Sequence, residues 1–242
     1  MRTRALLASW VLLLPLVWAT PARALPVTAV TVDAVTAPDL VVTGTGCKAV
    51  PVSVAYTATN APAEWDGVTF AADVRQGTRD VWVTRAPRST QLPATGAYYW
   101  CPVDGLGTFE VLNLTGDFLG WTQEVDPVQG RFASLLTATF TVRAGSRVSR
   151  VDVRRVGHGV AVSGRISSYE TSTGSWRAMD AGTPVVLQRR SAHGSWTDVR
   201  RVAAGTGGRL RTTVCAGHSE RYRWVYAGSG VVAPTRSRAA AG

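Results

Sequence analysis

The stretch Val52-Ser53-Val54-Ala55-Tyr56-Thr57-Ala58-Thr59 places Val52, Val54 and Tyr56 at every second position, with smaller or polar side chains between them. A period of two is typical of a β-strand with one buried face. Shorter β-branched and aromatic runs recur at residues 81–84 and 139–142, and Gly- and Pro-containing turns separate these runs. No segment combines helical apolar spacing with a helix cap. The sequence therefore predicts an all-β protein.

The same pattern continues through the second half of the chain. Short β-branched or aromatic runs follow one another with turn residues between them, at residues 148–156, 160–166, 185–188, 197–202, 210–214 and 222–226. Many short strands with regular turn signals are typical of a β-sandwich or a β-barrel. The length of 242 residues leaves room for two small domains, each large enough to bury its own core.

Charge divides the chain. Residues 25–144 contain seven basic and eleven acidic side chains, whereas residues 145–242 contain sixteen Arg and five acidic side chains. This change in composition predicts an acidic β-sandwich domain at 25–144 and a basic one at 145–242. With 45% hydrophobic residues the chain has the composition of a folded protein, which argues against disorder. Of the 26 basic residues only Lys48 is Lys, a bias that GC-rich codons alone would produce.

The first 24 residues resemble a secretory signal peptide. Arg2 and Arg4 precede an apolar run at residues 5–19, and Ala22-Arg23-Ala24 supplies the small residues that signal peptidase requires. The run is shorter than the roughly 20 apolar residues of a membrane span. We expect cleavage after Ala24 and a secreted, extracellular protein; the alternative is an uncleaved membrane anchor.

Two cysteines lie in the acidic half. Cys47 and Cys101 are 54 residues apart, and an exported chain meets an oxidising environment, so they are expected to form a disulfide bond. Residues 107–111 look like the next strand, which places Cys101 at a strand end. Cys215, in the basic half, is expected to be a buried and unreactive thiol; the alternative is an intermolecular disulfide.

In the basic half a series of short motifs stands in a familiar order. These motifs are Val160-Ala161-Val162-Ser163-Gly164-Arg165, Ser175-Trp176, Gly182-Thr183-Pro184-Val185-Val186-Leu187, Gly194-Ser195-Trp196, Gly208-Arg209-Leu210 and Tyr222-Arg223-Trp224. The order resembles the immunoglobulin-like domains of secreted actinobacterial proteins. The resemblance implies a seven-stranded sandwich with Trp196 and Tyr222 in or near its core. Residues 235–242 depart from the usual closing strand, so the last edge is expected to be frayed or unpaired.

Arginine is the side chain with the clearest functional implication. Along Arg221-Tyr222-Arg223-Trp224 and Arg209-Leu210-Arg211 the period of two sends Arg to one face and the apolar residues to the other. We expect an Arg-rich sheet face that binds an anionic polymer of the cell envelope, with the candidates Arg154, Arg189, Arg200, Arg209, Arg211, Arg221 and Arg223. Two alternatives stay open: a solvated basic surface without a ligand, and docking of this face on the acidic domain.

Tryptophan supports a competing hypothesis, in which the protein is a carbohydrate-binding module. Exposed aromatic rings can stack on sugars, and Trp65 and Trp121 lie in polar contexts that favour exposure. The other tryptophans after the signal segment serve equally well as core residues, and at least four of the seven are expected to be buried.

Catalytic motifs are scarce. His158, His193 and His218 all lie in the basic half, and one Cys215/His218 pair is too few ligands for a zinc site. Glu110, Asp117, Glu124 and Asp126 could supply a carboxylate pair for a hydrolase, although a solvated face is the better interpretation. Residues 88–96 are the only candidate for an inhibitory loop. We therefore expect no catalytic residues, metal or cofactor, and the partners to be an anionic polymer, an extracellular protein or a carbohydrate rather than nucleic acid.

Overall fold

A computed structural model describes residues 28–122, 127–191, 194–215 and 220–241. The segment predicted as a signal peptide and its cleavage site lie outside the described residues. Within them the chain forms β-strands and two short 3-10 helices but no α-helix, which confirms the predicted all-β class. No helix among these residues is long and apolar enough to cross a membrane.

Over the described residues 28–122 and 127–144, the first domain contains nine strands and one 3-10 helix. They are β1 (Ala29–Thr36), β2 (Leu40–Val42), β3 (Lys48–Thr59), β4 (Glu64–Gln76), β5 (Arg79–Ser89), β6 (Ala94–Trp100), η1 (Pro102–Asp104), β7 (Gly107–Trp121), β8 (Pro127–Ser134) and β9 (Ala138–Ala144). The strand order is β1-β3-β6-β5-β4-β7-β9-β2, and β8 pairs with the second half of β7. In chain order this is the A-B-E-D and C-F-G arrangement of an immunoglobulin-like sandwich, with β5 joining the two layers.

The second domain contains the remaining elements. They are β10 (Ser146–Val156), β11 (Gly159–Glu170), β12 (Ser175–Ala178), β13 (Pro184–Arg190), β14 (Thr197–Ala203), η2 (Thr206–Gly208), β15 (Arg209–Cys215), β16 (Arg221–Tyr226), β17 (Thr235–Arg236) and β18 (Ala240–Ala241). One sheet joins β10, β11, β12 and β15, and the other joins β14, β13, β16, β17 and β18. An A-B-E sheet thus faces a C′-C-F-G sheet, which is again an immunoglobulin-like arrangement.

Each sandwich has its own core. In the first domain, alternate residues of β3 such as Val50, Val52 and Val54 pack with Trp100 and Phe140. In the second, Val162 and Leu187 pack with the two large rings of β16, Tyr222 and Trp224. Every one of these side chains is almost fully buried. The period of two in the sequence therefore predicts the buried face of each strand correctly.

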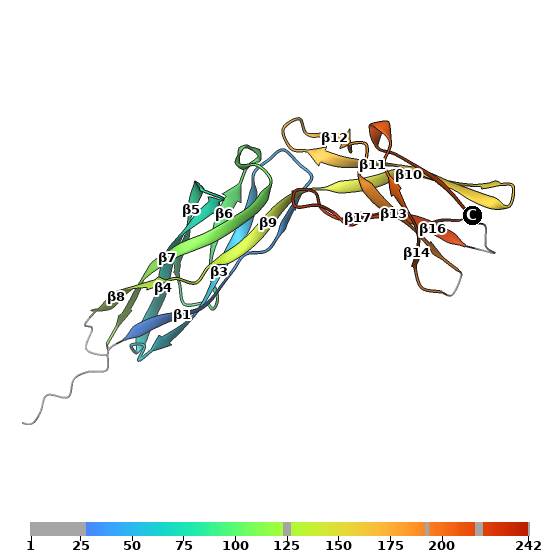
Figure 1. The fold of residues 1–242 in the computed structure, drawn as a ribbon. Helices are drawn as coiled ribbons and strands as arrows, with labels where there is room; N and C mark the ends of the chain where they lie inside the picture. Colours follow the sequence, from blue (N-terminus) through green and yellow to red (C-terminus); the bar gives the residue numbers. More distant parts are fainter. Residues whose placement is uncertain (1–27, 123–126, 192–193, 216–219, 242) are drawn as a thin grey trace, which may run out of the picture.

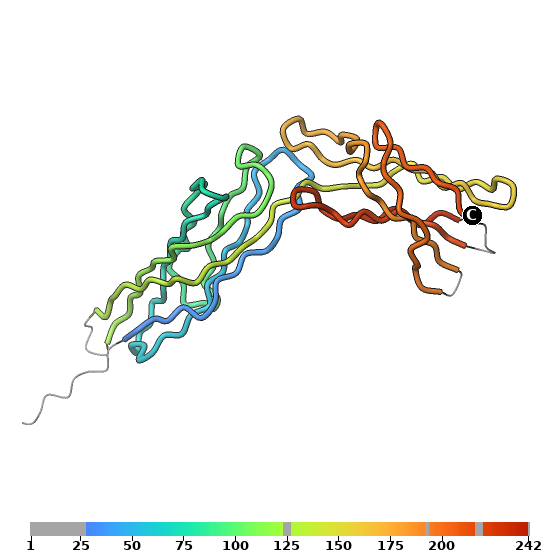
Figure 2. The backbone as a smooth tube through the Cα atoms, in the orientation of Figure 1, coloured from blue at the N-terminus to red at the C-terminus, as the bar shows by residue number. Residues whose placement is uncertain are grey.

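The last strand of the first domain runs directly into the first strand of the second. Figures 1 and 2 show two lobes joined end to end, with β9 leading into β10 across the joint. Gly145 lies between these strands, donating a hydrogen bond from its N–H to Val42 O (2.8 Å) and accepting one from Tyr169 N–H (2.8 Å). Ala144 exchanges hydrogen bonds with Val231 and Ala233 of the second domain, both of 2.9 Å. Residues of both domains therefore hydrogen-bond to the joint between β9 and β10.

The predicted disulfide is present. Cys47 and Cys101 are bonded, with a Cα–Cα distance of 4.2 Å, immediately beside the cross-strand pair of Lys48 and Trp100. Cys101 follows the end of β6, as expected from the strand assignment. The bond joins two neighbouring strands of one sheet, β3 and β6. It therefore fixes the ends of two neighbouring strands within one layer rather than bridging the two layers.

The C-terminal edge differs from the expectation. Residues 235–242 were expected to leave the last edge of the second domain unpaired, yet β17 and β18 both pair with β16. Between them, Ser237 donates from its N–H to Trp224 O (2.9 Å), and its Oγ accepts from Trp224 N–H (3.0 Å). The expectation was wrong because Ser237, in the gap between β17 and β18, supplies the hydrogen bonds to the backbone of Trp224 that a continuous strand would make.

Candidate functional site

The outer face of the sheet containing β13, β14, β16 and β17 is the strongest candidate site. Along β16, Tyr222 and Trp224 face the core, so Arg221, Arg223 and Val225 face outward. The cross-strand register adds residues from the neighbouring strands to this face. The basic face, as we define it, consists of Arg190, Arg201, Arg221, Arg223 and Arg236. Asp198, paired with Gln188, is its only acidic side chain among the described residues.

An aromatic ring lies within the basic face. The guanidinium carbon of Arg223 lies 4.0 Å from the centroid of the Trp196 ring, and that of Arg190 lies 5.0 Å from it. Arg223 Nε also donates to Gln188 Oε1 (2.9 Å), and Gln188 Nε2 donates to Asp198 Oδ1 (2.7 Å). Stacking and hydrogen bonding therefore hold Arg223 in a defined position. The resemblance implied a core or near-core place for Trp196, which is wrong because its ring packs on arginines of the outer face.

Like charges face one another across the basic face. Arg190 and Arg221 are directly opposed on β13 and β16, an arrangement that destabilises a sheet. Partial burial lowers the pKa of the Arg223 guanidinium, and the positive charges of Arg236 and Arg190 lower it further. A bound anion would relieve the repulsion between these arginines. This is a physical reason to regard the basic face as a binding site.

The structure does not bring the seven predicted arginines together. Only Arg221 and Arg223 lie on the basic face. Arg154, Arg209 and Arg211 lie on the opposite sheet, on β10 and β15. The expectation of one face containing all seven was wrong because β15 and β16 belong to different sheets. Period-two patterns show which side of a strand faces out, but not which sheet the strand joins.

Arg189 and Arg200 occupy a third place, at an edge of the sandwich. Both line a hollow of about 700 Å³ together with Val199 and His158. Arg189 also forms an ion pair of 3.4 Å with Glu220. In the register of β13 and β14, Arg200 pairs with the buried Leu187 and Arg201 with Val186, so the alternation along β14 turns Arg200 away from Arg201 and the basic face.

The two predicted tryptophan sites are half-buried. Trp65 stacks on Phe118 with 6.0 Å between ring centroids and packs against the core of the first domain. Trp121 pairs with Glu64 on one side and Pro127 on the other. Of the seven tryptophans that the structure describes, only Trp100 and Trp224 are fully buried, so the expectation of at least four buried tryptophans was wrong. The exposed aromatic residues that the sequence did not single out are Trp82 and Tyr99, at 54% and 58% exposure.

Cys215 is exposed and forms no disulfide within the chain, so the expectation of a buried thiol was wrong. Its position follows the period of two in β15, where Leu210 faces the core and Arg209, Arg211 and Thr213 face outward. Among the residues that the structure describes, no group of three or more His, Cys, Asp and Glu side chains could hold a metal ion. His193 and His218 lie outside those residues.

The remaining catalytic candidates do not form a site. Glu110 and Asp117 both lie on β7, roughly 20 Å apart at about 3.3 Å per residue, which is too far for a glycosidase pair. Glu124 and Asp126 lie outside the described residues. The proposed inhibitory loop at residues 88–96 belongs mostly to β5 and β6, with four residues left for the turn.

A buried tyrosine next to the basic face makes stability depend on pH. Tyr222 donates its hydroxyl proton to Glu220 Oε2 (2.6 Å), and burial followed by this hydrogen bond raises the pKa of Tyr222 to about 12. The unfolded chain ionises near pH 10, so the folded second domain keeps a proton that the unfolded one loses. Its free energy of unfolding should therefore fall as pH rises from 10 towards 12, by on the order of 1 kcal/mol.

Thermal unfolding of the second domain at pH 9, 10, 11 and 12 measures this fall. The second domain contains no Lys, so few other groups titrate in the same range. The variant Tyr222→Phe should show a clearly smaller fall. Equal falls in the two proteins would contradict the assignment to Tyr222.

Comparisons with known proteins add little to this geometry. No protein family model and no curated protein matches the chain. Among solved structures, the D0-D1 domain of intimin is 12% identical over 87% of this chain and 97% of that chain, with a TM-score of 0.29. An apo structure of Bacteroides uniformis beta-glucuronidase 3 is 13% identical over 84% of this chain and 23% of that chain, with a TM-score of 0.25. Similarities this weak identify no family and leave the function to be argued from the site.

Proposed function

We propose that this is a secreted, non-enzymatic binding protein whose basic face holds an anionic polymer of the cell envelope. The observation that carries the proposal is the basic face itself, with five arginines and one acidic side chain on a single sheet face. Secretion is supported by the signal-like first 24 residues and by the disulfide, which is typical of exported proteins.

Arginine on a flat sheet face suits a repeating anionic ligand. Guanidinium groups bind phosphate and carboxylate through two parallel hydrogen bonds. The stacking of Arg190 and Arg223 on Trp196 orders two of these groups before a ligand arrives, which lowers the entropic cost of binding. The strands of the face, β13 and β16, pair over five residues, so successive charges of an extended polymer can meet successive arginines.

Sedimentation with bacterial cell walls tests the proposal. The protein spanning residues 25–242 is mixed with purified walls before and after hydrofluoric acid removes their phosphate polymers. Binding to untreated walls should weaken in high salt, because exposed charges are screened. The double variant Arg221→Gln and Arg223→Gln should weaken binding about tenfold or more. Treated walls should bind less protein.

The opposite sheet provides a matched control. Arg209→Gln with Arg211→Gln removes the same charge from the same domain but leaves the basic face intact, and should affect binding far less. An equal loss in both double variants would show that only net charge matters and would overturn the proposal.

The single variant Arg221→Gln should also stabilise the second domain by about 0.2–1 kcal/mol, because it removes the repulsion with Arg190. If Arg221→Gln weakens binding while it raises stability, Arg221 acts on the ligand and not on the fold.

A further inference from the structure

The outer face of the first domain contains a hollow that is separate from the basic face of the second domain. It has a volume of about 580 Å³ and lies over β3, β5 and β6, lined by Ala49, Pro51, Arg85, Pro87, Thr95, Gly96, Ala97 and Tyr99. Its volume falls within the range of small-molecule sites. Arg85 is the only charged residue in this lining. Since the hollow belongs to the other domain, what it binds is independent of the basic face.

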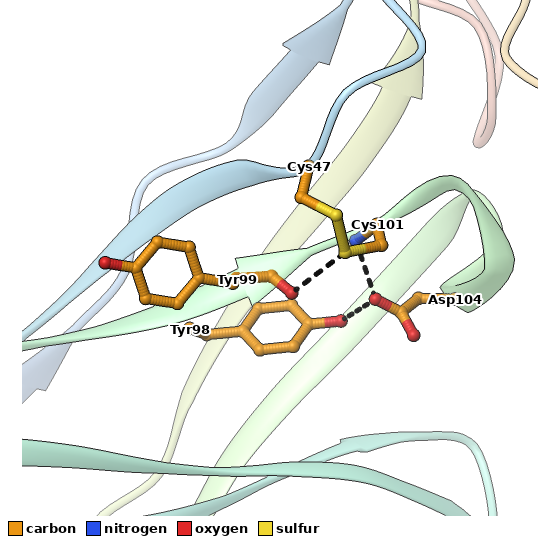
Figure 3. The surroundings of a disulfide bond; sticks show 5 residues. All are labelled: Cys47, Tyr98, Tyr99, Cys101 and Asp104. Atoms are coloured by element: carbon orange, nitrogen blue, oxygen red, sulfur yellow. Dashed lines mark hydrogen bonds between the residues drawn. A yellow bond between two sulfur atoms is a disulfide. The ribbon is translucent and has the colours of Figure 1, made fainter.

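Tyr99 provides a flat aromatic wall for this hollow. Tyr98 and Tyr99 lie on opposite sides of β6, so the Tyr98 hydroxyl meets Asp104 while the Tyr99 ring extends away from it (Figure 3). Ala49 is the cross-strand neighbour of Tyr99, and Pro51 pairs with Ala97 beside it. Because these neighbours are small, the face of the ring stays open to a ligand.

Arg85 is brought to this wall by a close approach of two strands. Gly96 permits the approach, since a Cβ at this position would collide with the backbone of Arg85 on β5. Arg85 is paired with Ala97 in the register, and its guanidinium makes no hydrogen bond or ion pair with any residue the structure describes. It also lines a second hollow of about 860 Å³, over β4, β7 and β8. An unpaired guanidinium therefore lies between two concave surfaces.

The hydroxyl group of Thr95 completes the lining. Thr95 lies at the edge of the hollow, and its Oγ1 is 3.2 Å from Ser53 Oγ on the neighbouring strand. An aromatic face, hydroxyls and one unpaired cation match a ligand that presents an apolar C–H face, hydroxyls and one anionic group. A sugar ring with a carboxylate presents all three.

We infer that Tyr99 and Arg85 form a binding site for an acidic oligosaccharide built from hexuronic acid units. The sugar ring stacks on Tyr99, and its carboxylate forms a two-pronged hydrogen-bonded pair with the Arg85 guanidinium. Thr95 hydrogen bonds to a ring hydroxyl. A neutral sugar would keep the stacking but lose the ion pair, so the site should prefer uronates.

Isothermal titration of the protein spanning residues 25–242 with tri-galacturonic acid tests the inference. The titrations use a background of Arg221→Gln and Arg223→Gln, so that a failure of the basic face as a polymer site does not affect the outcome. Affinity should fall about tenfold or more in Arg85→Gln and in Tyr99→Ala, and should be retained in Tyr99→Phe, which keeps the ring. The neutral trisaccharide galactotriose should bind at least tenfold more weakly than tri-galacturonic acid.

Trp82 provides the matched control. It is an exposed aromatic residue on β5 that does not line the hollow, so Trp82→Ala should leave the affinity unchanged. All of these positions are exposed, and circular dichroism should show that the variants stay folded. Unchanged affinity in both Arg85→Gln and Tyr99→Ala, or no binding of tri-galacturonic acid to the parent protein, would overturn the inference.

Discussion

Replacing both Cys47 and Cys101 by Ser is expected to lower the free energy of unfolding of the first domain by about 4 kcal/mol. The bond closes a loop with a sequence separation of 54, which contains β3, β4, β5 and β6. Without it, the unfolded chain gains the entropy that the closed loop had removed. The loss is a large share of the 5–15 kcal/mol that typically stabilises a domain.

Hydrogen exchange followed by mass spectrometry measures this loss separately in each domain. Peptides from β3 and β6 should exchange much faster in the double Ser variant, whereas peptides from β11 and β16 should not change. Cys215→Ser is the matched control, because it removes a thiol that forms no disulfide, and it should leave the first domain as stable as before. A loss below 1 kcal/mol in the double variant would show that the pairing of β3 with β6 already restricts the unfolded chain.

The second large effect is expected at Asp104, where Asp104→Ala should destabilise the first domain by about 3 kcal/mol. Asp104 Oδ2 accepts hydrogen bonds from Tyr98 Oη (2.9 Å) and from Cys101 N–H (2.7 Å). Tyr98 is fully buried, so its hydroxyl would be left without a partner in the core. Burial, followed by the bond to Asp104, raises the pKa of Tyr98 well above its ordinary value.

Urea denaturation of four proteins measures the coupling between these side chains. They are the parent protein, Asp104→Ala, Tyr98→Phe and the double variant. Because Tyr98→Phe removes the unsatisfied hydroxyl, the double variant should be less destabilised than the sum of the two single variants, by about 1 kcal/mol or more. Simple additivity would show that Asp104 acts only through the Cys101 N–H and the turn.

Much of the fold could be predicted because strand patterns are local. The alternation in residues 52–59 identifies Val52, Val54 and Tyr56 as buried, and all three lie in the core. The disulfide was predictable because only two cysteines lie in the acidic half. These inferences need only the direction of successive side chains and the chemistry of the compartment.

The candidate site was less predictable because it depends on pairing between distant strands. Arg209 and Arg223 obey the same alternation, yet β15 joins one sheet and β16 the other. Arg190, Arg201 and Arg236 join the basic face only through the register of β13, β14 and β17. Trp196 lies just before β14, so the alternation of strand residues does not predict to which face its ring turns. Tyr99 has a small neighbour across the sheet, Ala49, that is 50 positions away in the sequence.

The uninterrupted passage from β9 through Gly145 into β10 has a mechanical consequence. A pull on the two ends of the molecule reaches the joint through one continuous backbone, with no slack segment to extend first. In the first domain β2 runs parallel to β9, so the same pull slides the two strands past each other and loads the hydrogen bonds between Leu40–Val42 and β9 together. Bonds loaded together resist more force than bonds opened one after another. Tension along the chain should therefore be resisted by shear of the parallel pair β2 and β9 rather than by opening its hydrogen bonds one at a time.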